Sequence, residues 1–277
     1  MLLDLFLLNV FIMLCSWVLV TYNRRAGLVD VAWSFSIALN VIIAAWAIDS
    51  APMLVRLFLG LASGIWFSRL TWHLLRRYSN ETQEDTRYAN MRRAMGDYQH
   101  LGFLVFFIFQ AGLALLFSYP MLKLLSISTQ QWNDWTLVTV IVAGMIMLSA
   151  LIGESTADQQ LYRFKLDAQN QGKTADQQLY RFKLDAQNQG KTMDQGLWKY
   201  SRHPNYFFEW LHWFAYPVLG LAAGCYELWI YPLLMWLFLY YLTGIPFSEK
   251  QALTHRGDNY KDYQRRTSMF IPWPPKE

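Results

Sequence analysis

The segment SRHPNYFFEW places several hydrogen-bonding side chains directly before a long apolar run. We expect a helix to begin at Pro204, because proline suits a first helical turn, where its missing N–H costs nothing. Free backbone N–H groups and the helix dipole favour anions at such a turn. Asn205 and Tyr206 lie within the turn, and Arg202 and His203 come just before it. The spacing predicts a phosphate or pyrophosphate site, although a capped helix entry with no ligand would show the same residues.

Two ionisable side chains inside apolar runs could act directly on a substrate. Asp30 stands in LVDVAW, and His73 precedes Arg76 by three residues, which places both on one helical face. Ionisable groups at membrane depth are functional candidates by default. We therefore expect Asp30 and His73 to be catalytic, with Asp30 donating to a substrate carbonyl. The alternatives are a structural partner for Arg24 or Arg69 in the case of Asp30, and a packed imidazole in the case of His73.

The elements that must position these groups are membrane helices. Of the 277 residues, 54% are hydrophobic and only 16% are charged, whereas soluble domains carry about a quarter charged residues. We predict an all-α polytopic membrane protein with about seven transmembrane helices, because seven apolar runs approach the ~20 residues that cross a bilayer. These runs are 2–22, 28–48, 53–75, 101–122, 135–154, 204–224 and 226–247.

Lysine and arginine gather on alternate connections between the apolar runs, chiefly in 76–100, in 156–202 and after 249. By the positive-inside rule, the N-terminus faces out and the C-terminus faces the cytoplasm. An Arg-rich loop at 76–100 and a further loop at 156–191 are then cytoplasmic. Attraction to anionic headgroups would also explain such loops, so membrane lipids are expected partners whether or not a ligand binds there.

Several familiar site motifs do not occur in the sequence. There is no GxGxxG, no GxxxxGK[ST], no HExxH and no CxxC, and the five histidines are scattered. We therefore expect neither a Rossmann domain nor a P-loop, and no metal site. We also expect no nucleic-acid partner, and we expect a monomer.

An internal duplication occupies the loop at 156–191. The segment TADQQLYRFKLDAQNQGK stands at 156–173 and again, unchanged, at 174–191. A helical insertion of 18 residues would keep its face but move ~27 Å along the axis, so one copy alone can occupy a site built for the other. We favour the first copy for Asp158 and Lys165, and the end of the second copy for Lys191.

The segment DQGLWKYSRHPNYFFEW and the tail NYKDYQRRTSMFIPWPP resemble the membrane superfamily of steroid 5α-reductases, sterol reductases and isoprenylcysteine carboxyl methyltransferases. The resemblance is greatest to a bacterial branch related to the steroid 5α-reductases, which implies the bacterial inner membrane. It covers about 154–275 well, and 69–93 more weakly. In the reductases, it implies, the last three spans hold NADPH and the first four enclose an apolar substrate. The chain would then divide into 1–125 for the substrate and 126–277 for the cofactor.

The resemblance, together with the helix entry described above, also assigns cofactor-binding side chains. Arg76 and Arg87 resemble two arginines that hold phosphates, and Asp158 with Lys165 resembles an Asp–Arg pair. The full set comprises Arg76, Arg87, Tyr88, Asp158, Lys165, Lys191, Tyr200, Arg202, His203, Asn205, Tyr206, Glu209 and Tyr263. The steroid reductases also carry a Gln-Glu pair in the second span and a Tyr on the next. This chain lacks the Gln-Glu pair, so Asp30 would replace its Glu, and His73 falls where the Tyr would be.

We therefore expect an NADPH-dependent reductase that transfers a hydride to an activated C=C of a steroid-like or other lipid-soluble substrate. One alternative is an S-adenosylmethionine-dependent methyltransferase of the isoprenylcysteine type. That branch shares the RHP-x-Y entry but tends to carry paired glutamates where Glu249 is here followed by Lys250. The arginines of 76–93 favour NADPH, because S-adenosylmethionine has no phosphates. A second alternative is a lipid-binding membrane protein without catalysis.

Overall fold

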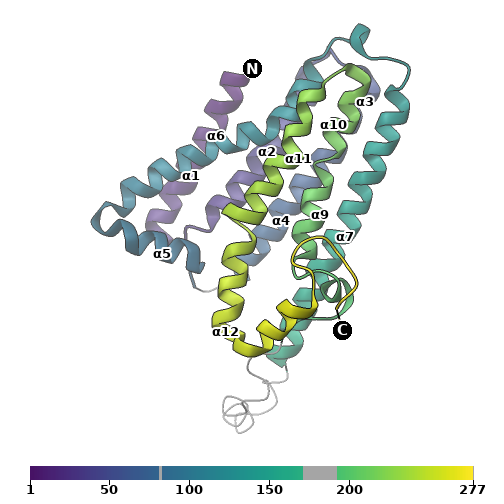
Figure 1. Cartoon of the computed structure of the whole chain (residues 1–277). Helices are drawn as coiled ribbons and strands as arrows, with labels where there is room; N and C mark the ends of the chain where they lie inside the picture. Colours follow the sequence, from purple (N-terminus) through teal and green to yellow (C-terminus); the bar gives the residue numbers. More distant parts are fainter. Residues whose placement is uncertain (81–82, 171–191, 277) are drawn as a thin grey trace. The chain divides into compact units, whose positions relative to one another are not determined.

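The computed structural model describes residues 1–80, 83–170 and 192–276 (Figure 1). Within these ranges the chain is all-helical and forms no strand. It divides into two compact units, each considered by itself below. The first unit comprises Met1–Gly144 with Leu219–Tyr226, and the second comprises Met145–Val218 with Glu227–Glu277. The predicted division at 125/126 concerns which ligand each part binds, and it stays a prediction.

Six helical segments of the described ranges are long and apolar enough to cross a membrane, which confirms an all-helical membrane protein in contact with lipid. They are Leu2–Asn23, Leu28–Ala47, Met53–Asn80, Thr86–Ser126, Thr136–Phe164 and Tyr226–Thr254. The predicted run at 204–224 differs from these. It forms three short helices, α9 (Pro204–His212), α10 (Ala215–Gly220) and η5 (Leu221–Ala223).

Pro217 explains the break in this run. It has no N–H to donate to the carbonyl of Trp213, and its ring crowds that carbonyl. Around the break the backbone tightens, so that Trp213 and Phe214 donate to Trp210 and Leu211, three residues back. The count of seven spans and the orientation of the termini stay predictions.

The first unit is a bundle in which α2 packs against α1, α4 and α6 (Figure 1). Its helices are α1 (Leu2–Asn23), α2 (Leu28–Ala47), α3 (Met53–Phe58), η1 (Leu59–Ser63), α4 (Gly64–Asn80), α5 (Thr86–Met95), η2 (Gly96–Tyr98), α6 (Gln99–Ser126) and η3 (Thr129–Gln131). Small residues let helices approach closely in lipid. A Cβ at Gly60 would lie 3.0 Å from the Cβ of Ala45, which is tighter than an ordinary contact, so glycine suits this spacing.

Polar contacts between buried side chains also join these helices. Asn40 of α2 donates to Ser118 of α6 over 3.0 Å, and Thr71 of α4 donates to Ser34 of α2 over 3.0 Å. Arg56, which interrupts the apolar run 53–75, donates to the last carbonyls of α2. Its charge therefore caps a helix end, where a cation is favourable.

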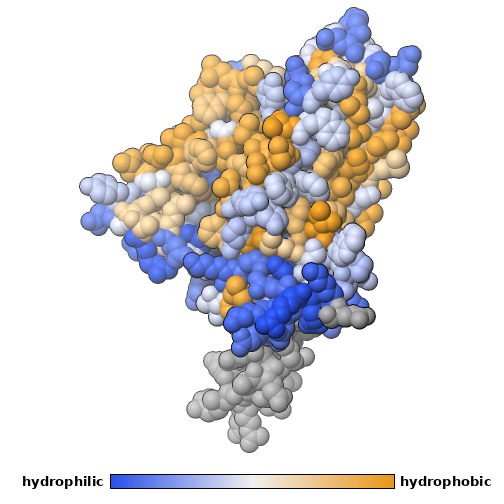
Figure 2. Space-filling model, in the orientation of Figure 1, coloured by the Kyte–Doolittle hydropathy of each residue, from blue (hydrophilic) through white to orange (hydrophobic). Residues whose placement is uncertain are grey.

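The second unit contains the site. Its elements are the part of α7 (Thr136–Asn170) after residue 144, η4 (Gly196–Lys199), α9, the start of α10, η6 (Tyr226–Trp229), α11 (Ile230–Leu237), η7 (Phe238–Leu242) and α12 (Ile245–Arg266). A Cβ at Gly153 of α7 would lie 2.3 Å from the Phe208 ring of α9, so the missing side chain makes room for that ring. Hydrophobic residues cover much of α1 and α7, whereas hydrophilic residues gather over the end of α12 (Figure 2).

Candidate functional site

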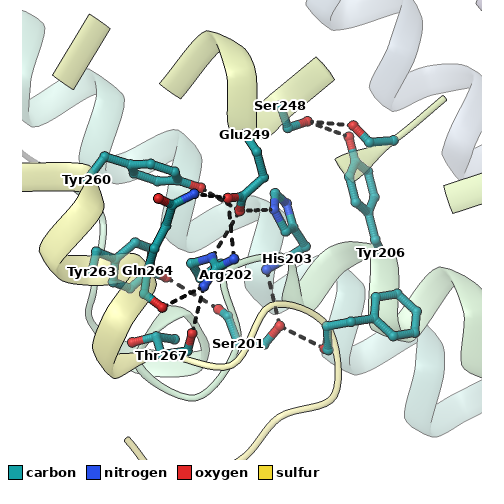
Figure 3. Close-up of polar contacts among 12 residues, drawn as sticks. Ser201, Arg202, His203, Tyr206, Ser248, Glu249, Tyr260, Tyr263, Gln264 and Thr267 are labelled. Atoms are coloured by element: carbon teal, nitrogen blue, oxygen red, sulfur yellow. Dashed lines mark hydrogen bonds and ion pairs between the residues drawn. The ribbon is translucent and has the colours of Figure 1, made fainter. Parts of the chain in front are cut away.

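The carboxylate of Glu249 on α12 accepts hydrogen bonds from four side chains (Figure 3). Oε1 accepts from Arg202 Nε at 2.9 Å, His203 Nε2 at 2.8 Å and Tyr260 OH at 2.9 Å. Oε2 accepts from Arg202 at 3.3 Å and from the Gln264 amide. We call Arg202, His203, Glu249, Tyr260 and Gln264 the Glu249 cluster. It joins the entry of α9 to α12.

A kink in α12 allows its two ends to meet at this carboxylate. Gly257 has φ 51° and ψ −126°, a conformation open to glycine and strained for other residues. The helix therefore changes direction between Glu249 and Tyr260. Burial, and then the charge of Glu249, raise the pKa of Tyr260, so its phenol stays a hydrogen-bond donor.

Arg202 is committed to contacts within the protein. Besides Glu249, its guanidinium donates to the backbone carbonyls of Gln264 and Thr267, each at 2.9 Å. The side chain is 9% exposed. Four of its five N–H groups are used within the protein, and its charge is balanced by Glu249, so it offers a phosphate no surplus charge. The predicted role of Arg202 in binding cofactor phosphates stays a prediction, but this geometry does not favour it.

His203 forms the other half of the entry. Burial lowers its pKa, and this outweighs the opposing effect of Glu249, so the imidazole is neutral at neutral pH. An ionised carboxylate can only accept, so neutral His203 carries its proton on Nε2 and bears a lone pair on Nδ1. The ring stacks on Tyr206, with 5.5 Å between centroids. Tyr206 OH lies 3.2 Å from Ser248 Oγ on α12.

The turn before α9 is tied down on both sides. Tyr263 of α12 donates to the carbonyl of Trp198, whose indole N–H donates to Ala157 of α7 over 3.1 Å. Gln160 of α7 accepts from the N–H of Leu197 at 3.0 Å. Burial raises the pKa of Tyr263, which keeps its phenol protonated. The predicted Tyr263 therefore lies in the site as an anchor of its backbone.

One face of α9 continues inward from this entry. Asn205, Glu209 and His212 follow at helical spacing, and α9 begins at Pro204 as predicted. The amide oxygen of Asn205 is buried and accepts no hydrogen bond within the described residues. Glu209 accepts from the indole of Trp213 at 3.3 Å. A ligand N–H or O–H would satisfy Asn205, because a buried acceptor without a donor is costly.

The predicted Arg-rich loop carries its own counter-charges in the first unit. Arg77 pairs with Asp85 at 2.9 Å, and Arg92 pairs with Glu84 at 2.8 Å. Arg87 pairs with Asp85 and with Asp30, both at 3.1 Å. Burial opposes ionisation of Asp85, but hydrogen bonds and charge from Arg87 outweigh it and lower the pKa. The arginine count that favoured a phosphate cofactor therefore overstates the cationic charge available to one.

Asp30 contacts Arg87 and Tyr88 and is not surrounded by apolar side chains alone. Its side chain is 30% exposed, and it accepts from Tyr88 OH at 2.6 Å and from Arg87. We expected Asp30 to be buried and to donate a hydrogen bond. In the structure its carboxylate instead accepts hydrogen bonds from a guanidinium and a phenol. His73 and Arg76 lie exposed on α4. Catalysis by Asp30 and His73 stays a prediction.

The remaining predicted residues divide by position. Asp158 is half-buried on α7, and Tyr200, 42% exposed, accepts from the Trp273 N–H at 2.9 Å through its carbonyl. The side chain of Lys165 and all of Lys191 lie outside the described residues, as does the second copy of the duplication. The structure therefore leaves their assignment as a prediction.

Apart from Tyr263, the residues that α12 contributes to the site were not predicted from the sequence. These are Glu249, Tyr260 and Gln264. The sequence does hold a signal, since Tyr260, Tyr263, Gln264 and Thr267 recur at intervals of three and four. That spacing places them on one helical face.

Comparisons with known proteins show the family of this chain. Residues 16–176 and 173–267 match the sequence profile of a protein family described as "Protein of unknown function (DUF1295)". The chain belongs to the DUF1295 family. This family is related to the steroid 5α-reductase and methyltransferase membrane proteins. The two matched segments of this DUF1295 protein meet where the first copy of its duplication ends and the second begins.

A more specific similarity is short. The DUF1295 protein is 46% identical over 35 residues to a methanethiol S-methyltransferase of Mycobacterium tuberculosis (strain H37Rv). The match covers 13% of this chain and 14% of that protein. No solved structure matches the chain.

Proposed function

We propose that this DUF1295 protein is a membrane methyltransferase that uses S-adenosylmethionine to methylate a thiol or similar nucleophile on a lipid-soluble molecule. The observation that carries the proposal is the pairing of Arg202 and His203 with Glu249 at the entry of α9. This pairing gives a polar, charge-balanced site rather than a cationic one. The short similarity to a methanethiol S-methyltransferase supports the same reaction class.

The residues present suit S-adenosylmethionine better than a dinucleotide. S-adenosylmethionine, when bound, supplies an electrophilic methyl group on a cationic sulfonium. Aromatic faces attract such cations, and Tyr206, Tyr260 and Trp210 lie at or beside the site. The buried oxygen of Asn205 could accept from an adenine amino group or a ribose hydroxyl. Nothing in this set requires phosphates.

Methylation of a thiol would break the methyl–sulfonium bond and release S-adenosylhomocysteine as the new S–C bond forms. The thiol proton must also leave, so the reaction needs a base. Neutral His203 donates its Nε2–H to Glu249 and bears a lone pair on Nδ1, which is the arrangement of a general base. After accepting the proton, the imidazolium would keep Glu249 as its counter-ion. We therefore propose His203 as the proton acceptor, with Glu249 as its positioning partner.

The NADPH-dependent reductase is retained as a second candidate. The observation in its favour is the contact of Asp30 with Tyr88 at 2.6 Å, an acid and a phenol of the kind that polarises an enone in the reductases it resembles. In this arrangement Tyr88 supplies the hydroxyl beside Asp30, a position for which the sequence suggested His73.

Ligand titration of the purified full-length protein separates the two candidates. We expect S-adenosylmethionine at 100 times its Kd to stabilise the fold by about 2.7 kcal/mol, and NADPH to have no effect. We also expect transfer of radiolabelled methyl to alkanethiols, which His203→Asn abolishes while ligand-induced stabilisation persists. Stabilisation by NADPH alone would replace this proposal with the reductase.

A further inference from the structure

A groove of about 390 Å³ lies on the surface of the second unit, apart from the Glu249 cluster. Its lining residues are Trp210, Phe214, Trp229, Pro232, Leu233 and Trp236. Sites for small molecules usually measure about 300–1,000 Å³ and are mostly apolar. The groove therefore has the size and the lining of a ligand site.

Aromatic contacts give the groove a firm wall. The Trp210 indole N–H donates to the carbonyl of Pro232 over 2.8 Å, so it is not offered to a ligand. Phe214 packs edge-on against Trp210, with 4.7 Å between centroids, and also contacts Trp229 at 6.1 Å. A hydrocarbon chain can therefore lie against Trp210 and Phe214 without leaving the Trp210 N–H unpaired.

The groove opens at membrane depth. Trp229, Leu233 and Trp236 belong to the segment Tyr226–Thr254, which is apolar enough to span a bilayer. The neighbouring Ile230 and Leu237 are 54% and 38% exposed. The groove would therefore face the hydrocarbon interior of the bilayer, and a ligand would enter it from there.

One wall of the groove is continuous with the candidate site. Trp210 packs against Phe270, with 5.5 Å between ring centroids. The Phe270 carbonyl accepts from Ser201 Oγ at 2.8 Å, and the same hydroxyl accepts from the N–H of His203 at 3.1 Å. These contacts link Trp210, through Phe270 and Ser201, to the backbone of His203, which we propose to act in catalysis.

We propose that this groove binds the hydrocarbon chain of the substrate and holds its reacting head toward the Glu249 cluster. The inference rests on the proposed function and narrows its substrate to a nucleophile on an apolar chain. Continuity with the site favours the substrate over a phospholipid acyl chain or a second copy of this protein.

A binding experiment tests the groove without requiring turnover. The full-length protein in phosphatidylcholine vesicles is labelled with a dodecanethiol that carries a diazirine near its chain end, and the labelled residues are mapped by mass spectrometry. We expect saturable labelling of the groove residues that excess dodecanethiol displaces. Leu233→Trp, which fills the groove, should reduce labelling at least tenfold. Leu237→Trp, on the same helix but outside the lining, should leave it unchanged.

An activity experiment tests the link to catalysis. With radiolabelled S-adenosylmethionine, Leu233→Trp should lower kcat/KM for dodecanethiol about tenfold and leave kcat/KM for ethanethiol unchanged, because only the long chain reaches the groove. Leu237→Trp should leave both values unchanged.

The outcomes distinguish the two proposals. Displaceable labelling without methyl transfer would support the groove and overturn the methyltransferase. Methylation of dodecanethiol that is equally fast in Leu233→Trp and Leu237→Trp, or labelling that is equal in both variants, would overturn the groove. Labelling that dodecanethiol cannot displace would assign the groove to bilayer lipid, and labelling that appears only in oligomers would assign it to a second copy. Either result contradicts the inference.

Discussion

The guanidinium of Arg202 contacts both carboxylate oxygens of Glu249, at 2.9 and 3.3 Å, although the two residues are 47 positions apart. Both side chains are largely buried, at 9% and 12% exposed. Each charge therefore depends on the other for compensation. This pair fastens the entry of α9 to α12 and balances the charge of Arg202 within the protein.

Glu249→Gln should destabilise the fold by about 3 kcal/mol, because it leaves the Arg202 charge buried with only carbonyl partners. Thermal unfolding of the purified protein measures the loss. The control is Asp258→Asn, which removes the ion pair of Asp258 with Lys261 at the surface and should have little effect. Unfolding of both variants at the wild-type temperature would show that the Arg202–Glu249 pair is not structural.

His203 should make stability depend on pH below about 6.5. Its folded-state pKa is lowered, chiefly by burial, so the unfolded chain binds a proton first as the pH falls. Stability is then unaffected above pH 6.5 and declines below it, by at most about 1.4 kcal/mol per pH unit. Thermal unfolding from pH 8 to 5 should show a smaller decline for His203→Asn. His100→Gln, at an exposed position, should retain the wild-type slope, and an equal slope in all three proteins would contradict the assignment.

Gly257→Ala should weaken the kink that brings Tyr260 to Glu249. The position has φ 51° and no neighbour within 4 Å of an added Cβ, so any cost comes from the backbone conformation alone. We expect a loss of about 1–3 kcal/mol, measured by thermal unfolding. Gly112→Ala is the matched control, since its added Cβ also meets nothing within 4 Å and it lies inside helix α6. If the two variants were equally stable, α12 would not depend on the kink.

A double-mutant cycle can decide whether Asp30 is catalytic or structural. If the Asp30–Arg87 contact is structural, Asp30→Asn and Arg87→Gln should couple by about 0.5–3 kcal/mol in unfolding. A catalytic Asp30 would instead lose turnover with little change in stability. His73→Phe provides the companion test of the second predicted catalytic residue. Full activity in both Asp30→Asn and His73→Phe would remove the reductase mechanism.

Local patterns in the sequence predicted the helical membrane fold and the start of α9. Apolar runs of about 20 residues and a proline at a helix start have direct physical meanings, so they identify elements without tertiary information. The run at 204–224 differs from the others because its hydrophobicity is continuous, whereas its helix is interrupted at residues 213–214, one turn before Pro217. A proline inside an apolar run was the available signal for that interruption.

The partners within the site were harder to predict, because charge balance depends on contacts between distant positions. Arg87 looked like a phosphate ligand, yet Asp30 neutralises it from 57 residues away. Arg202 likewise meets Glu249 only in the folded protein, because the two residues are 47 positions apart. Counting arginines in the loop gives its total charge, but only the fold shows how much of that charge is already paired.

The contacts of α7 with the 197–198 turn have a consequence for the duplicated segment. Ala157 and Gln160 of the first copy receive Trp198 and Leu197, and the second copy, which lies outside the described residues, repeats the same residue types as Ala175 and Gln178. Because the copies are identical, excising either one yields the same polypeptide, and it still carries both docking residues. Gain or loss of one copy therefore leaves the residues of this attachment point unaltered.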